Sequence, residues 1–285
     1  LFLYPPVTPS LEELEATLER ERISVMFLTT AFFEQMALNR PAALARVGQV
    51  LTGGDVLSPL AARKLLDAGR AVTNGYGPTE NTTFSATYQV KRDLDARMPV
   101  PIGRPLENSQ ALVLDARLEP VPPGVVGDLY VGGDGLAWGY LGRPELTADR
   151  FVPHPFSGVP GARLYRTGDR ARWLPSGELA FMGRADTQVK LRGFRIELGE
   201  IETALRHLPG VEDAVAEVRE YAPGDKRLVA YVTGADVDVN MLRSRLSAQL
   251  PAPLVPAAFV KLDRLPLTPV GKVDRRSLAT PVGDA

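Results

Sequence analysis

The sequence Asn74-Gly75-Tyr76-Gly77-Pro78-Thr79-Glu80 places turn-forming residues beside an aromatic ring, a hydroxyl and a carboxylate. Its glycines allow backbone angles closed to other residues, and its proline fixes its own φ and restricts the residue before it. The composition therefore predicts a rigid, exposed loop between two regular elements. In such a loop the ring of Tyr76 can stack on another flat ring, the hydroxyl of Thr79 can bind a phosphate oxygen, and the carboxylate of Glu80 can hold Mg²⁺. A tight turn around a buried tyrosine is the alternative interpretation.

The segments before this loop alternate between strand-like and helix-like patterns. Apolar, β-rich runs predict strands at residues 1–4, 23–28, 49–51 and 71–73. Helical patterns predict helices at 30–38 and 58–68, after an earlier helix that Ser10 and Glu13 open with capping-box spacing. The alternation favours an α/β layer of parallel strands, in which ligands bind at the carboxyl ends of the strands. Gly53, Gly54 and the loop at 74–80 all follow such ends.

The pattern changes twice further along the chain. Short strands at 111–114 and 128–131 predict a β-rich, barrel-like region or a distorted sheet, and an amphipathic helix at 197–208 opens a small α+β region. That region continues with predicted strands at 211–218, 228–232 and 259–262 and a helix at 239–250. The fold class is therefore α/β plus α+β: a partial large N-terminal core followed by a small mobile C-terminal domain. Its parts are the end of an α/β subdomain (1–97), a β-rich subdomain (98–184), a hinge (185–187) and the α+β domain (188–285).

Composition excludes several classes of function. The 285 residues suggest about two domains, and 45% hydrophobic and 24% charged residues are typical of a soluble globular protein. The net charge of −1 indicates neither nucleic acid nor an anionic membrane surface as a partner. The absence of cysteine excludes disulfides, thiolate metal sites and a cysteine nucleophile, and there are only two histidines and no G-x-S-x-G elbow. No apolar run reaches the length of a membrane span, about 18 residues. The first residues contain neither an initiating methionine nor a charged leader, so we expect the middle of a longer, cytoplasmic polypeptide.

Five further motifs carry groups that suit chemistry. Gly132-Gly133-Asp134-Gly135 with Gly139-Tyr140 is a glycine-rich turn, most simply structural, and its spacing rejects a dinucleotide fingerprint. Asp169, which ends Tyr165-Arg166-Thr167-Gly168-Asp169, is a carboxylate able to accept bonds from vicinal ribose hydroxyls, although Gly-Asp is also an ordinary turn.

The other three motifs lie at residue 183 and beyond. Gly183-Arg184-Ala185-Asp186 is a small-residue junction that suits a linker or hinge. Alternation places Lys190, Arg192 and Arg195 on one face of a strand or ribbon, or on a solvated basic edge. Lys272 lies in a Gly-flanked segment that is not a Walker A loop, and a lysine there can stabilise charge developing on a carboxylate and a phosphate.

Together these motifs resemble the adenylation domain of nonribosomal peptide synthetases, in the superfamily of acyl-CoA synthetases and beetle luciferases. The resemblance covers residues 1 to about 279 and rests on the order and spacing of N-G-Y-G-P-T-E, G-D-G-L-A-x-G-Y, Y-R-T-G-D, G-R-A-D-T-Q-V-K-L-R-G-F-R-I-E and G-K-V-D-R. It implies activation of an amino acid by ATP to an aminoacyl-adenylate. Transfer to the phosphopantetheine thiol of a peptidyl carrier protein would follow, beside neighbouring synthetase domains.

The resemblance also assigns roles to residues of this chain. Tyr76 would stack on adenine, Thr79 would bind phosphate, Glu80 would hold Mg²⁺, Asp169 would bind the ribose with Arg184 nearby, and Asp186 would be the hinge. The full set expected to bind the nucleotide is Gly53, Gly54, Asn74, Gly75, Tyr76, Thr79, Asp169 and Arg184. Lys272 would act with Thr79 and Glu80 in adenylation, whereas Lys190, Arg192 and Gly193 would serve thioester formation.

Two features of the family pattern are missing from this chain. The phosphate loop that ends in P-K-G and the aspartate that binds the substrate amino group lie upstream of these motifs in the family. The chain therefore resembles only the C-terminal part of an adenylation domain, and we expect it to be inactive alone. No carrier-type Gly-Gly-x-Ser site follows Ala279.

The family's pocket positions predict the amino acid. They match Ala31 (with Phe32 as the alternative), Leu51, Gly53, Gly75, Thr83 and Phe84, with Lys272 at the carboxylate. This lining is apolar apart from one hydroxyl, so a charged or amide side chain would be buried unpaired at a cost. The pattern resembles that for valine and similar branched aliphatics, with isoleucine or leucine next.

Two other functions remain open. A related ligase could activate an acyl or aryl acid and transfer it to CoA, and the missing amine-binding aspartate would decide between the two enzymes. A non-catalytic fragment that binds nucleotide or a carrier is the third interpretation.

Overall fold

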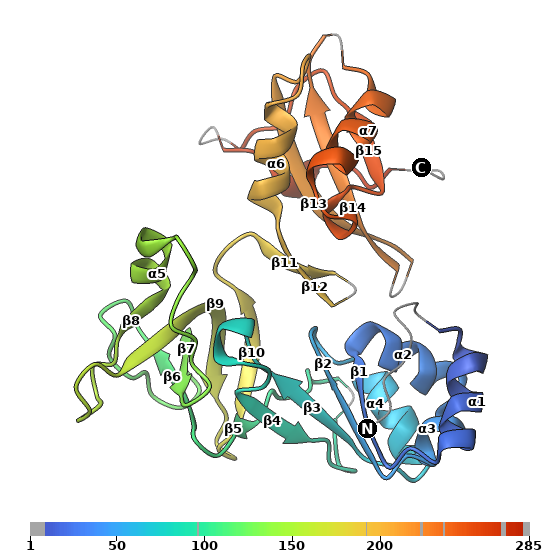
Figure 1. The fold of residues 1–285 in the computed structure, drawn as a ribbon, viewed down its shortest axis with the longest axis vertical. Helices are drawn as coiled ribbons and strands as arrows, with labels where there is room; N and C mark the ends of the chain where they lie inside the picture. The colour runs from blue at the N-terminus through green and yellow to red at the C-terminus, as the bar shows by residue number, and fades with distance from the viewer. Residues whose placement is uncertain are drawn as a thin grey trace. The chain divides into compact units, whose positions relative to one another are not determined.

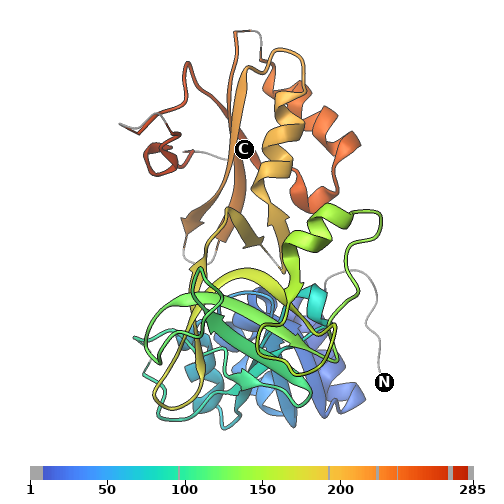
Figure 2. The same cartoon turned by 90° about the vertical axis from the view of Figure 1, so that its left-hand side faces the viewer.

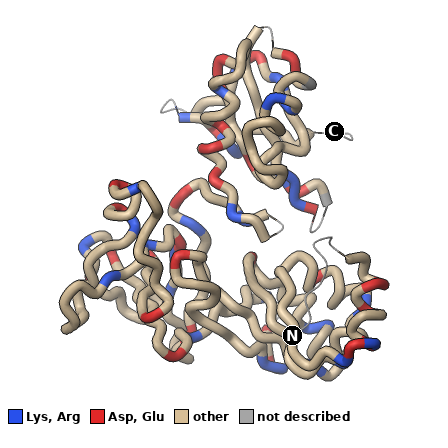
Figure 3. Tube along the Cα trace, viewed as in Figure 1, with Lys and Arg blue, Asp and Glu red and all other residues tan. Residues whose placement is uncertain are grey.

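The computed structural model describes residues 9–95, 97–191, 193–222, 225–235, 237–268 and 272–281, except the side chains of residues 222 and 240. The chain divides into two compact units, Leu1–Asp186 and Thr187–Ala285 (Figure 1). The strand expected at residues 1–4 lies outside the described residues. Lys, Arg, Asp and Glu are interspersed along both units (Figure 3). Within the described residues, no helix is long and apolar enough to cross a membrane.

The first unit begins with the α/β layer that the sequence predicts. Its sheet has the order β1-β2-β3-β4-β5, in which β1 to β3 are parallel and β4 and β5 are added antiparallel. The strands are β1 (Val25–Thr29), β2 (Gln49–Gly53), β3 (Val72–Tyr76), β4 (Ala86–Gln89) and β5 (Arg104–Pro105). The helices are α1 (Leu11–Glu21), α2 (Thr30–Asn39), α3 (Pro41–Ala45) and α4 (Pro59–Asp67). The predicted parallel arrangement is confirmed.

Local sequence explains where these helices begin. The capping box is present at α1, where Ser10 Oγ accepts from the backbone N of Glu13 and Glu13 in turn accepts from the backbone N of Ser10. Ser58 caps α4, and Pro59 occupies its first turn, where a missing N–H costs nothing.

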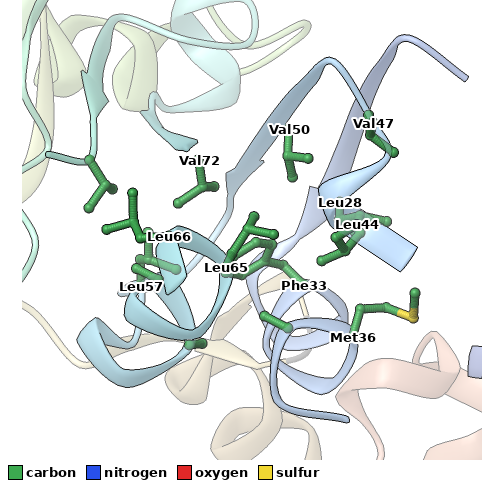
Figure 4. Close-up of a cluster of buried hydrophobic side chains, with 14 of the residues drawn as sticks. Leu28, Phe33, Met36, Leu44, Val47, Val50, Leu57, Leu65, Leu66 and Val72 are labelled. Atoms are coloured by element: carbon green, nitrogen blue, oxygen red, sulfur yellow. The ribbon is translucent and has the colours of Figure 1, made fainter. Parts of the chain in front are cut away.

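One face of the sheet packs on these helices. Leu28, Val50 and Val72 of the three parallel strands meet Phe33 of α2 and Leu65 of α4 in a buried apolar core (Figure 4). The alternation of side chains along a strand places the neighbouring residues on the opposite face. Two of them, Val25 and Phe27, are 57% and 50% exposed.

The rest of the first unit is β-rich. Its strands are β6 (Ser109–Leu114), β7 (Gly127–Gly133), β8 (Phe151–Pro153), β9 (Arg163–Trp173) and β10 (Leu179–Arg184), with helix α5 (Pro144–Arg150) before β8. They form an antiparallel sheet of order β10-β9-β7-β6, with β8 paired to β9. The order is open among the described strands, so the predicted distorted sheet is present but a closed barrel is not.

The second unit is the expected α+β arrangement. It contains β11 (Gln188–Leu191), β12 (Phe194–Glu197), α6 (Leu198–Arg206), β13 (Asp213–Ala222), β14 (Asp225–Thr233), α7 (Val239–Gln249) and β15 (Ala258–Lys261). Strands β13, β14 and β15 form one sheet, with β15 parallel to β14. The apolar stripe of α6 and residues of α7 cover one face of this sheet (Figure 2). The other face buries Val229 and Tyr231 against Leu265 and Leu278.

One local prediction was wrong. Residues 74–76 are not an exposed loop: they are the buried end of β3, and the turn begins only at Gly77, before the 3₁₀ helix η1 (Thr79–Asn81). Gly75 and Gly77 are also absent from the positive-φ residues. Lys190 and Arg195 share a ribbon, as one of the two expected arrangements has it, and they pair across the β11–β12 hairpin.

Candidate functional site

Three residues from distant parts of the first unit meet in one hydrogen-bonded cluster. The hydroxyl of Tyr76, at the end of β3, donates to Oδ2 of Asp169 on β9 at 2.5 Å. Nη1 of Arg184, at the end of β10, donates to Oδ1 of the same carboxylate at 2.5 Å. Tyr76 is 7% exposed and Asp169 4% exposed. Burial, reinforced by the Asp169 carboxylate, raises the pKa of Tyr76 well above its ordinary value, so its hydroxyl stays a proton donor.

Arg184 connects this cluster to the end of the first unit. Its Nε and Nη2 donate to the two carboxylate oxygens of Asp186 at 2.7 and 2.8 Å, and Nη2 also reaches the carbonyl of Thr167 at 3.2 Å. Gly168, with φ of +76°, makes room for this fork, because a Cβ there would lie 2.6 Å from Arg184 Nη2 and from Asp186 Oδ2. Glycine is thus required at 168 both for its backbone angle and for space.

Glu80 is held in a second cluster of the same unit. Tyr140 donates its hydroxyl to Glu80 Oε1 at 2.5 Å, and the hydroxyls of Tyr140 and Tyr165 are 3.2 Å apart. Burial raises the pKa of Tyr140, and the hydrogen bond to Glu80 raises it further. Thr79, the preceding residue, is exposed, whereas Glu80 itself is half-buried.

The sequence leads us to expect Mg²⁺ at Glu80, and the groups around Glu80 fit this ion in only one way. Within the described residues, no group of three or more His, Cys, Asp or Glu side chains could hold a metal ion. Mg²⁺ commonly takes one or two protein carboxylates together with substrate phosphates and water. Glu80 therefore fits as the protein's ligand to a cation that arrives with a phosphate substrate.

Four of the predicted pocket residues lie together at the carboxyl ends of β2 and β3. Gly53 and Gly75 pair in register, and the ring of Phe84 covers both. A Cβ on Gly75 would come within 2.6 Å of that ring, and one on Gly53 within 2.5 Å of the Gly75 carbonyl oxygen. Leu51 shares the strand and face of Gly53, and the ring of Phe27 is 5.6 Å from that of Phe84. The glycines therefore serve close approach rather than turn geometry.

The other residues expected at the nucleotide site and the pocket make fewer contacts with these four residues. Gly54 is exposed with φ of +99°. Asn74 is buried and donates Nδ2 to the Pro101 carbonyl at 2.9 Å, which makes it a support for the strand end. Ala31 and Thr83 are exposed.

The residues expected to serve the second half of the chemistry belong to the second unit. Lys190 pairs with Arg195 in the β11–β12 hairpin, and Gly193, with φ of +85°, forms its turn. Arg192 lies outside the described residues. Lys272 is exposed, and its backbone N donates to Thr268 Oγ1 at 3.2 Å.

Sequence reasoning missed two contacts of the cluster around Glu80. Tyr140 and Tyr165 stand in quoted motifs, but nothing in the sequence joins either hydroxyl to Glu80. The Gly139-Tyr140 pair is visible in the sequence, but it does not specify a partner for the tyrosine hydroxyl.

The chain is similar to known proteins over most of its length. The profile of the AMP-binding enzymes matches residues 1–141, and that of the AMP-binding enzyme C-terminal domain matches residues 200–272. Tyrocidine synthase 3 of Brevibacillus parabrevis is 47% identical over 276 residues, which are 96% of this chain and 4% of that protein. The dimodular nonribosomal peptide synthase of Bacillus subtilis (strain 168) is 49% identical over 271 residues, 95% of this chain and 11% of that protein.

Solved structures agree. Holo-PA1221, an NRPS protein containing adenylation and PCP domains bound to a vinylsulfonamide inhibitor, superposes with a TM-score of 0.85 at 36% identity, over 95% of this chain and 47% of that one. Holo-AB3403, a four-domain nonribosomal peptide synthetase bound to AMP and glycine, is 42% identical over 96% of this chain and 20% of its own, with a TM-score of 0.56. The chain thus spans a small part of its curated relatives and about half of the first of these structures.

Proposed function

Because this chain belongs to the AMP-binding enzymes and matches the adenylation domains of nonribosomal peptide synthetases, we propose that it carries the nucleotide-binding part of a domain that activates an amino acid with ATP. In this reaction a carboxylate oxygen of the amino acid attacks the α-phosphorus of ATP. The bond to pyrophosphate breaks, and an aminoacyl-adenylate forms.

The observation that carries the proposal is the cluster of Tyr76, Asp169 and Arg184. Tyr76 and Asp169 are 93 residues apart in the chain, yet their side chains are joined by a hydrogen bond. In a nucleotide the base and the ribose are directly bonded, so a stacking ring and a ribose-binding carboxylate must also be neighbours. The carboxylate oxygens have about four lone-pair sites between them, so Asp169 keeps acceptor capacity for ribose hydroxyls beside its two protein donors.

Other residues supply charge stabilisation. Thr79, next to Glu80, offers a hydroxyl to the phosphates. Mg²⁺, when bound by Glu80 and phosphate oxygens, would offset the negative charge of the reacting phosphate. Lys272 of the second unit would offset the charge shared by the carboxylate and the α-phosphate, since a cation placed where charge develops lowers the barrier.

For the amino acid, we propose valine or another branched aliphatic, isoleucine or leucine. Leu51, Gly53, Gly75 and Phe84 offer apolar surface and no charged partner, which supports an apolar side chain. Ala31, or Phe32, and Thr83 would complete the lining, and Lys272 would meet the carboxylate.

The second half-reaction would use the second unit. The thiolate of a carrier protein's phosphopantetheine arm attacks the acyl carbon and AMP leaves, so a thioester forms. We assign Lys190, Arg192 and Gly193 to this step and Asp186 to the hinge between a core of two subdomains (1–97 and 98–184) and the C-terminal domain (188–285). The reaction needs ATP and free amino acids, so we place it in the cytoplasm.

Amino-acid-dependent ATP–pyrophosphate exchange tests this function, with the chain expressed in its natural polypeptide and a panel of acids. Exchange with valine or its neighbours is the expected result, and exchange with aspartate, lysine or phenylalanine in preference to valine would refute the pocket assignment. Exchange only with acids that lack an amino group would move the protein to the acyl- or aryl-acid CoA ligases. Silence with every acid, together with calorimetric binding of AMP, would leave the non-catalytic interpretation. We expect the 285 residues alone to be silent.

A further inference from the structure

The glycine-rich segment after β7 packs against the 3₁₀ helix that carries Glu80. The backbone N of Ala137 donates to the carbonyl of Glu80 at 2.8 Å. Two residues beyond Glu80, Thr82 Oγ1 donates to the carbonyl of Gly135 at 2.8 Å. The backbone of Glu80 and the side chain of Thr82 are thus tied to one strand connection of the neighbouring sheet.

Tyr140 lies at the end of that segment and is itself fixed. Its backbone N donates to Thr147 Oγ1 at 2.9 Å, and that hydroxyl donates to the carbonyl of Arg143 at 2.9 Å, at the start of α5. The ring of Tyr140 meets that of Phe151 edge-on, with centroids 5.6 Å apart, and Phe151 packs in turn on Tyr165. Both the backbone and the ring therefore direct the hydroxyl toward Glu80.

The hydroxyls form an ordered chain. An ionised carboxylate only accepts hydrogen bonds, so the proton of Tyr140 belongs to its 2.5 Å contact with Glu80. A phenol has one proton, and Tyr140 must therefore accept from Tyr165 across their 3.2 Å contact. A donor that also accepts is polarised and donates more strongly.

We propose that Tyr140 is a positioning residue that holds the Glu80 carboxylate in the orientation in which it receives the divalent cation accompanying ATP. The proposal rests on the function proposed above. A glutamate side chain on a surface turn samples several rotamers, and each must be lost when it binds a cation. A hydrogen bond from a fixed phenol removes that freedom in advance, as groups that orient metal ligands do elsewhere.

The substitution Tyr140→Phe tests this, because it removes only the hydroxyl. The measurement is calorimetric titration of ATP with and without Mg²⁺, using the natural polypeptide, and its readout is the ratio of the two dissociation constants. We expect Tyr140→Phe to lower the gain in ATP affinity that Mg²⁺ brings (the Mg²⁺ gain) by about tenfold, which is the low end of the effect of removing groups that orient metal ligands. Binding of metal-free ATP should change less than about twofold, since one hydrogen bond distant from the base and ribose is lost.

Tyr130→Phe is the matched control. Tyr130 is buried in the same sheet, on β7, and packs with Leu114 and Leu164 instead of the site. A Mg²⁺ effect of Tyr140→Phe no larger than that of Tyr130→Phe would overturn the proposal. The proposal also fails if Tyr140→Phe lowers the Mg²⁺ gain equally in a Glu80→Gln background, because Tyr140 is proposed to act only through Glu80.

If Tyr140→Phe does not fold, Tyr165→Phe takes its place. It keeps the ring and hydroxyl of Tyr140 but removes the Tyr165 hydroxyl that donates to it, so the Mg²⁺ gain should fall by a smaller factor. No fall relative to Tyr130→Phe would count against the proposal. Failure of the parent function is distinguishable: a wild-type protein that exchanges no pyrophosphate with any acid refutes the function, whereas normal exchange with an unchanged Mg²⁺ gain refutes only the role of Tyr140.

Discussion

The substitution Asp169→Asn removes the charge on which Tyr76 and Arg184 converge. An asparagine can keep its oxygen toward Arg184 and turn its amide toward Tyr76, whose hydroxyl can accept. The number of hydrogen bonds is then preserved, and the variant reports the loss of the buried negative charge. The perturbation falls on a side chain that is 6% exposed, paired with an arginine that is 12% exposed.

The expected loss in the free energy of unfolding follows from this burial. Removing one partner of a buried ion pair costs about 3–5 kcal/mol. Arg184 keeps Asp186, whose side chain is 30% exposed and thus a weaker substitute, so we expect the lower end, about 3 kcal/mol. For a unit of this size a loss of 1 kcal/mol lowers the Tm by about 2–4 °C, which gives a decrease of roughly 6–12 °C. Affinity for AMP should also fall about 10- to 100-fold, since a hydrogen bond to a charged group contributes about 1.5–3 kcal/mol.

Thermal unfolding followed by circular dichroism and calorimetric titration with AMP measure the two effects. Asp128→Asn is the matched control on the same sheet, because Asp128 faces Arg166 at 3.8 Å in a more exposed pair and should lose under about 1 kcal/mol. If Asp169→Asn melts like Asp128→Asn and binds AMP as the wild type does, the cluster neither stabilises the fold nor binds the ribose.

Three further predictions concern the pocket, the alkaline limb of stability and the lysine of the second unit. Gly75→Ala should reduce pyrophosphate exchange with valine relative to alanine about tenfold or more, because its Cβ would come within 2.6 Å of the Phe84 ring and one methylene changes the binding free energy in a pocket by about 1–3 kcal/mol. An unchanged valine-to-alanine ratio would contradict the pocket assignment. The pKa of Tyr76 is raised in the folded state, so its contribution to the free energy of unfolding is complete below the unfolded pKa of about 10 and is lost as pH rises through the folded pKa. Urea unfolding between pH 8 and about 11 should therefore show a smaller fall in the free energy of unfolding for Tyr76→Phe than for the wild type. Parallel curves would refute this. Lys272→Ala should lower pyrophosphate exchange about 100-fold or more, the scale of a group that stabilises transition-state charge, while thioester formation from supplied adenylate stays within a fewfold; equal loss in both assays would contradict a role in adenylation alone.

Local signals predicted the framework well. The capping box at Ser10 acts between neighbours in sequence, so it is visible in the sequence and is confirmed by the hydrogen bonds of α1. Apolar runs likewise located β1, β2 and the start of β3, and their alternation with helices predicted the parallel order.

Tertiary contacts decided what the sequence did not. Residues 74–76 have the composition of a turn, but hydrogen bonds to β2 and β4 on either side hold them in the sheet. Gly75 is a glycine because Phe84 lies against it, and no pattern in sequence distinguishes that reason from a turn. The link between Glu80 and Tyr140, 60 residues apart, depends in the same way on how the sheets pack.

The meeting of Tyr76, Asp169 and Arg184 was expected only through resemblance to a family. Each motif alone fits an ordinary turn or junction, and the spacing between them contains no geometry. The nucleotide-binding roles remain predictions that rest on this cluster.

A crystal structure of the natural polypeptide with AMP bound tests the central claim most directly. We predict that the two ribose hydroxyls lie within hydrogen-bond distance of the Asp169 carboxylate and that the adenine lies against the ring of Tyr76. AMP bound elsewhere, with the Tyr76–Asp169 contact unapproached by the nucleotide, would contradict it.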